Sequence, residues 1–138
     1  MIRLAYISSA SPDLLEDDVA ALALKAADFN SRHEITGLLL YNGLNFLQFL
    51  EGDETVVTDL FAAIVLDPRH DGVVKVLQEP IDARAFPDWG MRYSRVLCSA
   101  LPTRTETLPP NIGQADLPDT VPGHLRRIAE NFDTLSPA

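Results

Sequence analysis

The chain has 138 residues, of which 46% are hydrophobic, and a formal net charge of −9. This length suits one domain with its own core, and the negative charge argues against nucleic acid or an anionic membrane as a partner. No apolar run reaches the length of a membrane span, and the N-terminus carries no signal-peptide pattern. Cys98 is the single cysteine, which excludes an internal disulfide and predicts a cytoplasmic protein.

A strand and a helix are predicted at the start of the chain. Residues 2–9 alternate as a strand that places Tyr6 and Ser8 on one face. The Ser-Pro-Asp sequence at residues 11–13 is typical of a helix start, because proline is tolerated in the first turn and an acidic residue can cap it. The helix should run to about Ser31. Apolar residues at helical spacing form its predicted buried stripe: Leu15, Val19, Leu22, Ala26 and Phe29.

Two apolar strands joined at Asn42-Gly43 form the centre of the predicted fold. Asn-Gly is the strongest short signal for a two-residue hairpin turn of type I′. That turn would place Gln48 opposite Gly37, in an apolar row. A buried amide without partners costs about 1–3 kcal/mol. An amide beside a gap in an apolar wall therefore indicates a flat ligand with polar edges.

The later elements complete a sheet. Asp53 is predicted to cap a second helix, which ends before Pro68 because the residue preceding a proline disfavours helical dihedral angles. A β-branched strand follows at residues 73–77, and alternating side chains predict a last strand from Trp89 to about Leu97. The order β-α-β-β-α-β-β predicts an α+β, ferredoxin-like sheet with two helices on one face.

The chain is predicted to divide into a domain at residues 1–97 and a proline-rich tail at 98–138. Within the tail, Gly123–Leu135 predicts a short amphipathic helix. So small an apolar stripe is unstable alone, and we expect it to dock on the sheet or on a second subunit. The expected receptor is the sheet face away from the two helices, where apolar residues would otherwise meet water: Leu38, Leu40, Leu47 and Phe49.

Phosphate loops, nucleophile elbows and metal-ligand clusters are missing from the sequence. Instead, Tyr6, Asn30 and Gln48 are polar residues at positions that should point inward. Taken singly, a buried tyrosine usually just packs, an asparagine near a helix end usually caps it, and a strand glutamine usually faces solvent. Together they converge on the space between the first helix and the sheet, which predicts a ligand site. Trp89 and Met91 alternate on the last strand, a pattern that is more often plain core.

At these positions the sequence resembles the BLUF family, blue-light sensors that use a flavin. The resemblance covers residues 2 to about 97. It rests on Tyr6 in LAYISSA, Asn30 in ADFNSRHEITGLLLY, Gln48 in NFLQFLEG, and the segments at residues 67–70 and 84–91. It implies a non-covalent flavin between the two helices, normally FAD, with FMN or riboflavin as alternatives.

The resemblance also implies roles for single residues. Asn30 would contact the carbonyl and imide edge of the flavin, and Gln48 would lie between Tyr6 and the flavin N5/O4 edge. Light would drive an electron and a proton from Tyr6 and return them, leaving Gln48 rotated or tautomerised. The predicted photoactive residues are Tyr6, Gln48, Trp89 and Met91. The predicted cofactor-binding residues are Tyr6, Ser8, Asn30, Arg32, Gln48, Arg69 and His70, and His33 lies beside Arg32 in the loop that would reach the ring edge or phosphates.

We therefore expect a short, stand-alone photoreceptor that has no enzymatic activity and signals to an unidentified protein partner as a homo-oligomer. One alternative is a ferredoxin-like regulatory module that binds a small metabolite in the same pocket. Another is an acylphosphatase-like enzyme, which would need an arginine in the loop after the first strand, and SSASPD contains none. The colour of the purified protein separates the classes, because only the photoreceptor would be yellow with a reversible light-induced red shift.

Overall fold

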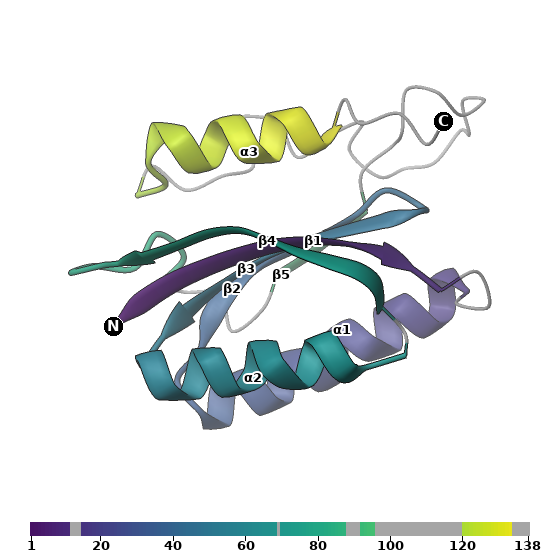
Figure 1. Ribbon diagram of the computed structural model, residues 1–138, viewed down its shortest axis with the longest axis horizontal. Helices are drawn as coiled ribbons and strands as arrows, with labels where there is room; N and C mark the ends of the chain where they lie inside the picture. The colour runs from purple at the N-terminus through teal and green to yellow at the C-terminus, as the bar shows by residue number, and fades with distance from the viewer. Residues whose placement is uncertain (12–14, 69, 88–91, 96–119, 134–138) are drawn as a thin grey trace.

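The computed structural model describes residues 1–11, 15–68, 70–87, 92–95 and 120–133. Helices α1 and α2 cover one face of a sheet, and α3 lies on the other face (Figure 1). The predicted order of helices and strands is confirmed. The elements are β1 (Ile2–Ala10), α1 (Glu16–Arg32), β2 (Thr36–Tyr41), β3 (Asn45–Gly52), α2 (Glu54–Leu66), β4 (His70–Pro80), β5 (Arg92–Arg95) and α3 (Gly123–Asp133).

The sheet has the strand order β4-β1-β3-β2-β5. β1 lies in the interior and pairs antiparallel with β3 and β4, and β2 pairs antiparallel with β3. The ferredoxin-like arrangement is thus confirmed. β5 adds to the edge, parallel to β2. Trp89 and Met91, which were predicted to begin this last strand, lie outside the described residues.

The turn between β2 and β3 is centred one residue later than predicted. Its central residues are Gly43 and Leu44, between Asn42 and Asn45. The Asn42 side-chain oxygen accepts hydrogen bonds from the backbone N–H groups of Leu44 at 3.0 Å and Asn45 at 2.7 Å. Gly43 has φ 99°, at the first central position, where a type II′ turn needs positive φ. Asn42 therefore acts through its side chain, as asparagine often does in turns.

This shift of the turn changes which residues face each other across β2 and β3. Gln48 pairs with Leu39, and Gly37 pairs with Leu50. The prediction that Gln48 faces Gly37 is therefore wrong. Because the register has moved by two residues, every side chain stays on its predicted face of the sheet.

The two helices of the covered face begin at different kinds of residue. α2 is capped by Asp53 as predicted, since its carboxylate accepts from the N–H groups of Thr55 and Val56. α1 begins at Glu16, later than the start predicted at residues 11–13, of which Pro12 and Asp13 lie outside the described residues. Leu15 and Phe29 are 67% and 41% exposed. Their predicted burial is wrong, because Leu15 is the N-cap residue that precedes α1 and Phe29 lines an open cavity beneath the helix.

Alternating residues of the strands build two apolar cores. Residues such as Leu4, Phe46 and Leu50 pack beneath α1 and α2. The other core joins the sheet to α3, which confirms the predicted docking of this helix on the sheet. Its buried members include Leu38, Leu40, Leu47 and Phe49 from the sheet and Leu125, Ala129 and Phe132 from α3.

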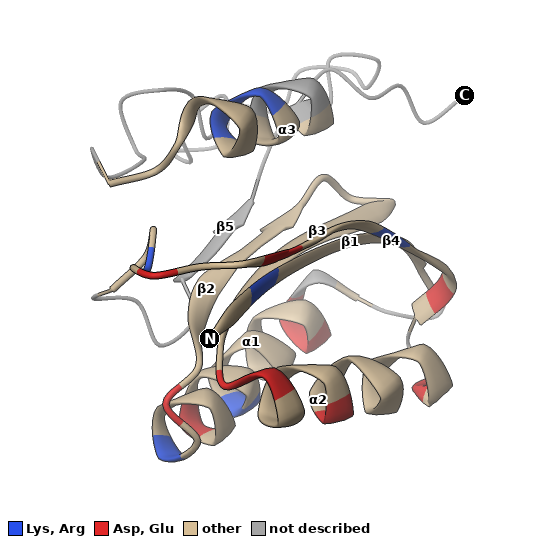
Figure 2. Ribbon diagram, turned by 60° about the vertical axis from the view of Figure 1, so that its left-hand side comes forward, with Lys and Arg blue, Asp and Glu red and all other residues tan. Residues whose placement is uncertain are grey.

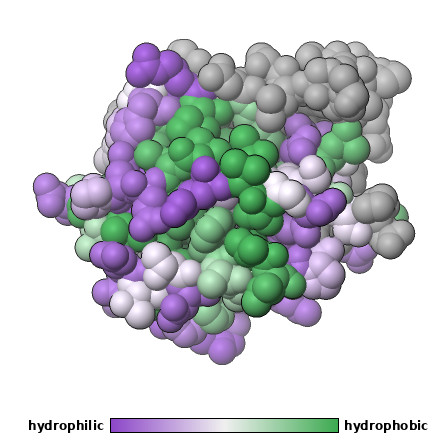
Figure 3. All heavy atoms as spheres, viewed as in Figure 1, coloured by the Kyte–Doolittle hydropathy of each residue, from purple (hydrophilic) through white to green (hydrophobic). Residues whose placement is uncertain are grey.

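The surface differs between the helices and the outer strand. Acidic residues are spread along α1 and α2 (Figure 2). Apolar atoms reach the surface between α3 and α2, along β4 (Figure 3), where Val74 and Val76 are 61% and 43% exposed. An edge strand with exposed apolar side chains is a surface that another chain can cover. No helix within the described ranges is long and apolar enough to cross a bilayer.

Candidate functional site

A cavity of about 290 Å³ lies between α1, α2 and the sheet. Its lining includes four of the predicted site residues: Tyr6, Asn30, Gln48 and His70. Apolar side chains of both helices, among them Leu22, Phe29, Leu60 and Ile64, form much of the remaining wall. Apolar walls with a few converging polar groups are typical of small-molecule sites. No group of His, Cys, Asp and Glu side chains in the described part of the chain is arranged to hold a metal ion.

Tyr6 and Gln48 form the polar floor of the cavity. β1 and β3 place them directly opposite each other, and paired residues share a face of the sheet. Both side chains are buried, and the Tyr6 hydroxyl donates a hydrogen bond to the Gln48 side-chain oxygen. Burial raises the pKa of Tyr6 far above its ordinary value, and the negative charge of Asp67 raises it further. The phenol is therefore fully protonated at neutral pH.

Ser8 and His70 form a second polar pair beside this floor. The Ser8 hydroxyl lies 2.8 Å from His70 Nδ1. The imidazole meets the Tyr6 ring nearly edge-on, with centroids 5.9 Å apart, and lies 4.9 Å from the Phe46 ring. His70 begins β4, which pairs with β1. The fold thus brings a histidine from late in the domain against the tyrosine of the first strand.

Asn30 lies near the end of α1 with its side chain buried in the cavity wall. Its backbone carbonyl accepts from the N–H groups of His33 at 3.2 Å and Ile35 at 2.8 Å, so the backbone closes the helix. Within the described residues, the side-chain Nδ2 has no hydrogen-bond partner. An unsatisfied buried N–H costs about 1–3 kcal/mol. A ligand with a carbonyl at this edge of the cavity would satisfy it, and the pyrimidine edge of a flavin carries such carbonyls.

A family model described as sensors of blue-light using FAD matches residues 1–92. The chain belongs to this BLUF family. It is 40% identical over 112 residues to the photoactivated adenylate cyclase subunit beta of Euglena longa, a match that covers 80% of this chain and 12% of that protein. It is 44% identical over 62 residues to the blue light- and temperature-regulated antirepressor BluF of Escherichia coli, covering 45% of this chain and 15% of that protein.

Solved structures agree with the BLUF assignment. The dark-state structure of the BLUF protein BlrB has a TM-score of 0.65 and 38% identity, covering 68% of this chain and 71% of that one. A bacterial light-regulated adenylyl cyclase has a TM-score of 0.67 and 35% identity, covering 69% of this chain and 28% of that one. The chain therefore contains a flavin-binding sensor domain for blue light. The metabolite-binding and acylphosphatase alternatives are not favoured.

Other predicted BLUF site residues are either described and absent from the cavity lining or lie outside the described residues. Arg32 is exposed and pairs with Asp28, one turn earlier on α1. His33 stacks on Phe29, with ring centroids 4.0 Å apart, and also lies outside the cavity lining. Arg69, Trp89 and Met91 lie outside the described residues. Their roles toward the flavin, and that of Arg32, stay predictions.

The cavity also contains two charged residues that were not predicted as site residues. Lys25 lines it from α1, one turn before Phe29, and Asp67 lines it from the end of α2. Helical spacing offered a signal for Lys25, since it falls on the same face as Leu22 and Phe29. A charged residue on an amphipathic helix normally faces solvent, so the sequence alone does not place Lys25 in the site.

Proposed function

We propose that this BLUF domain is a blue-light photoreceptor that has no catalytic activity of its own and holds the isoalloxazine of FAD in the cavity between α1 and α2. The observation that carries the proposal is the Tyr6–Gln48 hydrogen bond at the floor of that cavity, beside the unsatisfied Nδ2 of Asn30. FAD is the proposed flavin because the matching family is defined by it. A cytoplasmic location remains the expectation from the single cysteine.

The proposed chemistry begins at Tyr6. Bound flavin supplies absorption of blue light and an excited state that takes an electron and a proton. Tyr6 would lose the electron and the proton. Its hydroxyl already donates a hydrogen bond to the Gln48 side-chain oxygen, which is therefore the first acceptor for the proton. When the electron and the proton return to Tyr6, the Gln48 amide would be left rotated or tautomerised. An amide suits this role because it has a donor end and an acceptor end that can exchange.

Other residues of the cavity would hold and orient the flavin. Asn30 would donate its free N–H to a ring carbonyl, which removes the cost of burying that group. Ser8 and His70 would fix the wall behind Tyr6. Arg32 and Arg69 are proposed for the ring edge or phosphates, and Trp89 and Met91 for transmission beyond the cavity.

Output is proposed to pass to a protein partner. The relatives named photoactivated adenylate cyclase and bacterial light-regulated adenylyl cyclase join light sensing to a cyclase, and the antirepressor BluF is named as light-regulated. We propose a homo-oligomer as well, with the exposed valines of the β4 edge as the supporting observation.

The test is an absorption experiment on purified protein reconstituted with FAD. We expect a yellow protein whose spectrum shifts to the red in blue light and recovers in the dark. Gln48→Leu should keep the flavin and lose the shift, because leucine fills similar volume without either hydrogen-bonding end. Gln78→Leu makes the same change at an exposed position of β4 and should behave as wild type. A protein that takes up no flavin, or a full shift in Gln48→Leu, would contradict the proposal.

A further inference from the structure

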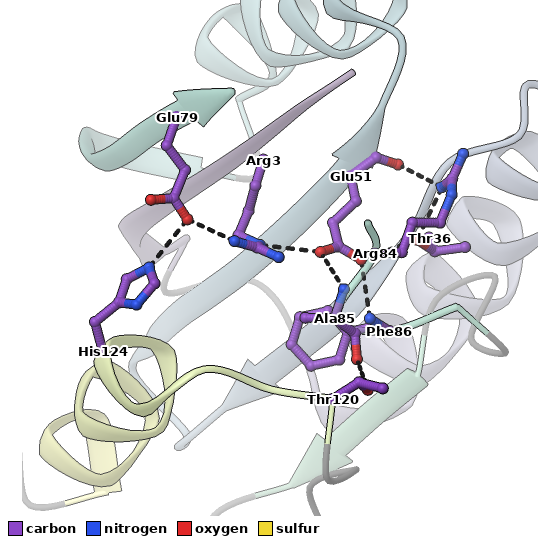
Figure 4. A network of polar contacts seen from close by, with 9 residues as sticks. All are labelled: Arg3, Thr36, Glu51, Glu79, Arg84, Ala85, Phe86, Thr120 and His124. Carbon is purple, nitrogen blue, oxygen red and sulfur yellow. Dashed lines mark hydrogen bonds and ion pairs between the residues drawn. The ribbon is translucent and has the colours of Figure 1, made fainter. Parts of the chain in front are cut away.

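Glu51 is a carboxylate with 0% exposure at the end of β3, on the sheet face that α3 covers. It lies three residues after Gln48 on the same strand, with its side chain on the opposite face. Four hydrogen bonds satisfy it (Figure 4). The donors are Arg3 Nε at 2.9 Å, the Thr36 hydroxyl at 3.2 Å, and the backbone N–H groups of Ala85 at 2.8 Å and Phe86 at 2.9 Å.

Two routes lead from this carboxylate to α3. Along one, Arg3 bridges Glu51 to Glu79 of β4, and Glu79 lies 3.0 Å from Nε2 of His124 in the first turn of α3. Along the other, the Ala85 carbonyl accepts a 2.6 Å hydrogen bond from the hydroxyl of Thr120, just before α3 begins. The start of α3 is thus held at two points, and both lead back to Glu51.

The segment that Glu51 holds is also fixed to the cavity side of the domain. Arg84 donates to the backbone carbonyls of Glu51 at 2.9 Å and Glu34 at 2.7 Å, and to the Thr36 hydroxyl at 2.9 Å. Glu34 follows the end of α1, the helix that contributes Asn30 to the cavity. Residues 84–86 are therefore hydrogen-bonded to β3, to β2 and to the residue that follows α1, so their position depends on all three.

We propose that Glu51 is a positioning residue that couples the strand carrying Gln48 to the seating of α3. A strand is stiff along its length, so a change in the hydrogen bonds of Gln48 that moves β3 also moves the Glu51 carboxylate. Because this carboxylate sets the place of Ala85 and Phe86, the movement reaches Thr120, and through Arg3 and Glu79 it reaches His124. This inference rests on the proposed function, since its input is the change at Gln48.

The test measures two properties of the full chain with bound FAD. The red shift reports the change at Gln48, and hydrogen–deuterium exchange of residues 123–133, in the dark and under blue light, reports the seating of α3. In wild type we expect faster exchange of α3 in the light. Glu51→Gln should keep the red shift and lose this light–dark difference. Glu54→Gln, the same change at an exposed position of α2, should keep both.

A purely structural role for Glu51 gives a different result. Glu51→Gln would then speed the exchange of α3 equally in dark and light, and the difference would survive, which overturns the proposal. Thr120→Val provides a milder variant at the edge of the network, with only the hydroxyl that donates to Ala85 removed. It should speed the exchange of α3 in the dark by roughly fivefold, the effect of losing one ordinary hydrogen bond, and should make the light–dark difference smaller.

The outcomes separate this inference from the proposed function. A wild-type protein without a red shift contradicts the proposed function itself. A normal red shift with no light–dark difference at α3, or with a difference that Glu51→Gln and Thr120→Val leave unchanged, overturns the coupling role alone.

Discussion

The two faces of the sheet are made by the same strands, yet they differ in how their polar groups are satisfied. Under α1 and α2 there is a cavity, and Asn30 Nδ2 is the one buried side-chain nitrogen or oxygen in the described ranges that lacks a hydrogen-bond partner. Under α3 the space is filled by apolar side chains, and the buried carboxylate of Glu51 is fully paired. A buried donor without a hydrogen-bond partner beside a cavity indicates a ligand. A fully hydrogen-bonded network indicates that the segments it joins are held together.

Alternation along single strands produces this difference. In β3, Phe46 and Gln48 face the cavity side, while Leu47 and Phe49 face α3. A change on one face is therefore one residue away from the packing of the other. Substitutions that damage one face and spare the other test how far the two are independent.

The largest effect is expected from Tyr6→Phe on the cavity face. It removes the hydroxyl that donates to Gln48 and leaves the ring in place, so flavin should bind with a nearly unchanged dark spectrum and the photocycle should disappear. Tyr41→Phe is the matched control, since Tyr41 is buried on the same face but donates to the Gly43 carbonyl instead. Transient absorption and the quantum yield of the red shift provide the measurement. An unchanged yield in Tyr6→Phe would assign the electron donor to another residue.

A break on the opposite face should leave the light response intact. Phe132 is fully buried between α3 and the sheet, and Phe→Ala changes in cores cost about 3–5 kcal/mol. Because α3 is short, we expect Phe132→Ala to release this helix while the red shift keeps its size. Arg127→Ala, at an exposed position of α3, should leave the helix seated. Limited proteolysis and size-exclusion chromatography measure the release, and an α3 that stays protected in Phe132→Ala would show that other contacts seat it.

Much of this two-faced design could be predicted from alternation and helical spacing. Period two assigns each side chain of β2 and β3 to a face, so the convergence of Tyr6 and Gln48 could be predicted even though the register was wrong by two residues. The register could not be predicted, because the Asn42 side chain replaces the backbone oxygen as acceptor in the turn. This exchange of one hydrogen-bond acceptor for another leaves the hydrophobic pattern of the sequence unchanged.

The positions of three charged residues could not be predicted from sequence patterns. Lys25 and Asp67 line the cavity, but a charge on a helix or at its end is usually solvated, so only the fold reveals their place. Glu51 is similar, because its partners come from β1, β2 and residues 85–86. A network assembled from distant segments leaves no local pattern in the sequence.

Asn30→Leu should have opposite effects on the two states of the cavity. In flavin-free protein it replaces an unsatisfied buried donor with an apolar group, so the free energy of unfolding should rise by about 1–3 kcal/mol. In the flavin complex it removes a donor from the ligand, and the affinity should fall by roughly tenfold, or about 1.4 kcal/mol. Urea unfolding and flavin titration measure the two effects.

Asn45→Leu serves as the contrasting variant for Asn30. The Asn45 amide already donates to the Ser8 carbonyl at 3.5 Å and to the Ser9 hydroxyl at 3.4 Å. Its loss should not stabilise the flavin-free protein. A flavin-free Asn30→Leu protein that is less stable than wild type would show that the Asn30 side chain supports the fold rather than the ligand.

The smallest effect is expected at the rim of the α3 face, from Glu79. Burial opposes its ionisation, but hydrogen bonds from His124 and Arg3 outweigh this and hold the pKa of Glu79 below its ordinary value of 4.5. A carboxylate with a lowered folded-state pKa contributes stability above its unfolded-state pKa and loses it as the pH falls through the lowered value. The attachment of α3 to the sheet through Glu79 and His124 should therefore weaken in acid, below about pH 4.5. Glu79→Gln should remove this part of the pH dependence, whereas Glu54→Gln should retain it. The NMR shifts of the α3 amides during an acid titration provide the measurement. Equal acid responses in Glu79→Gln and wild type would assign the loosening of α3 to other carboxylates.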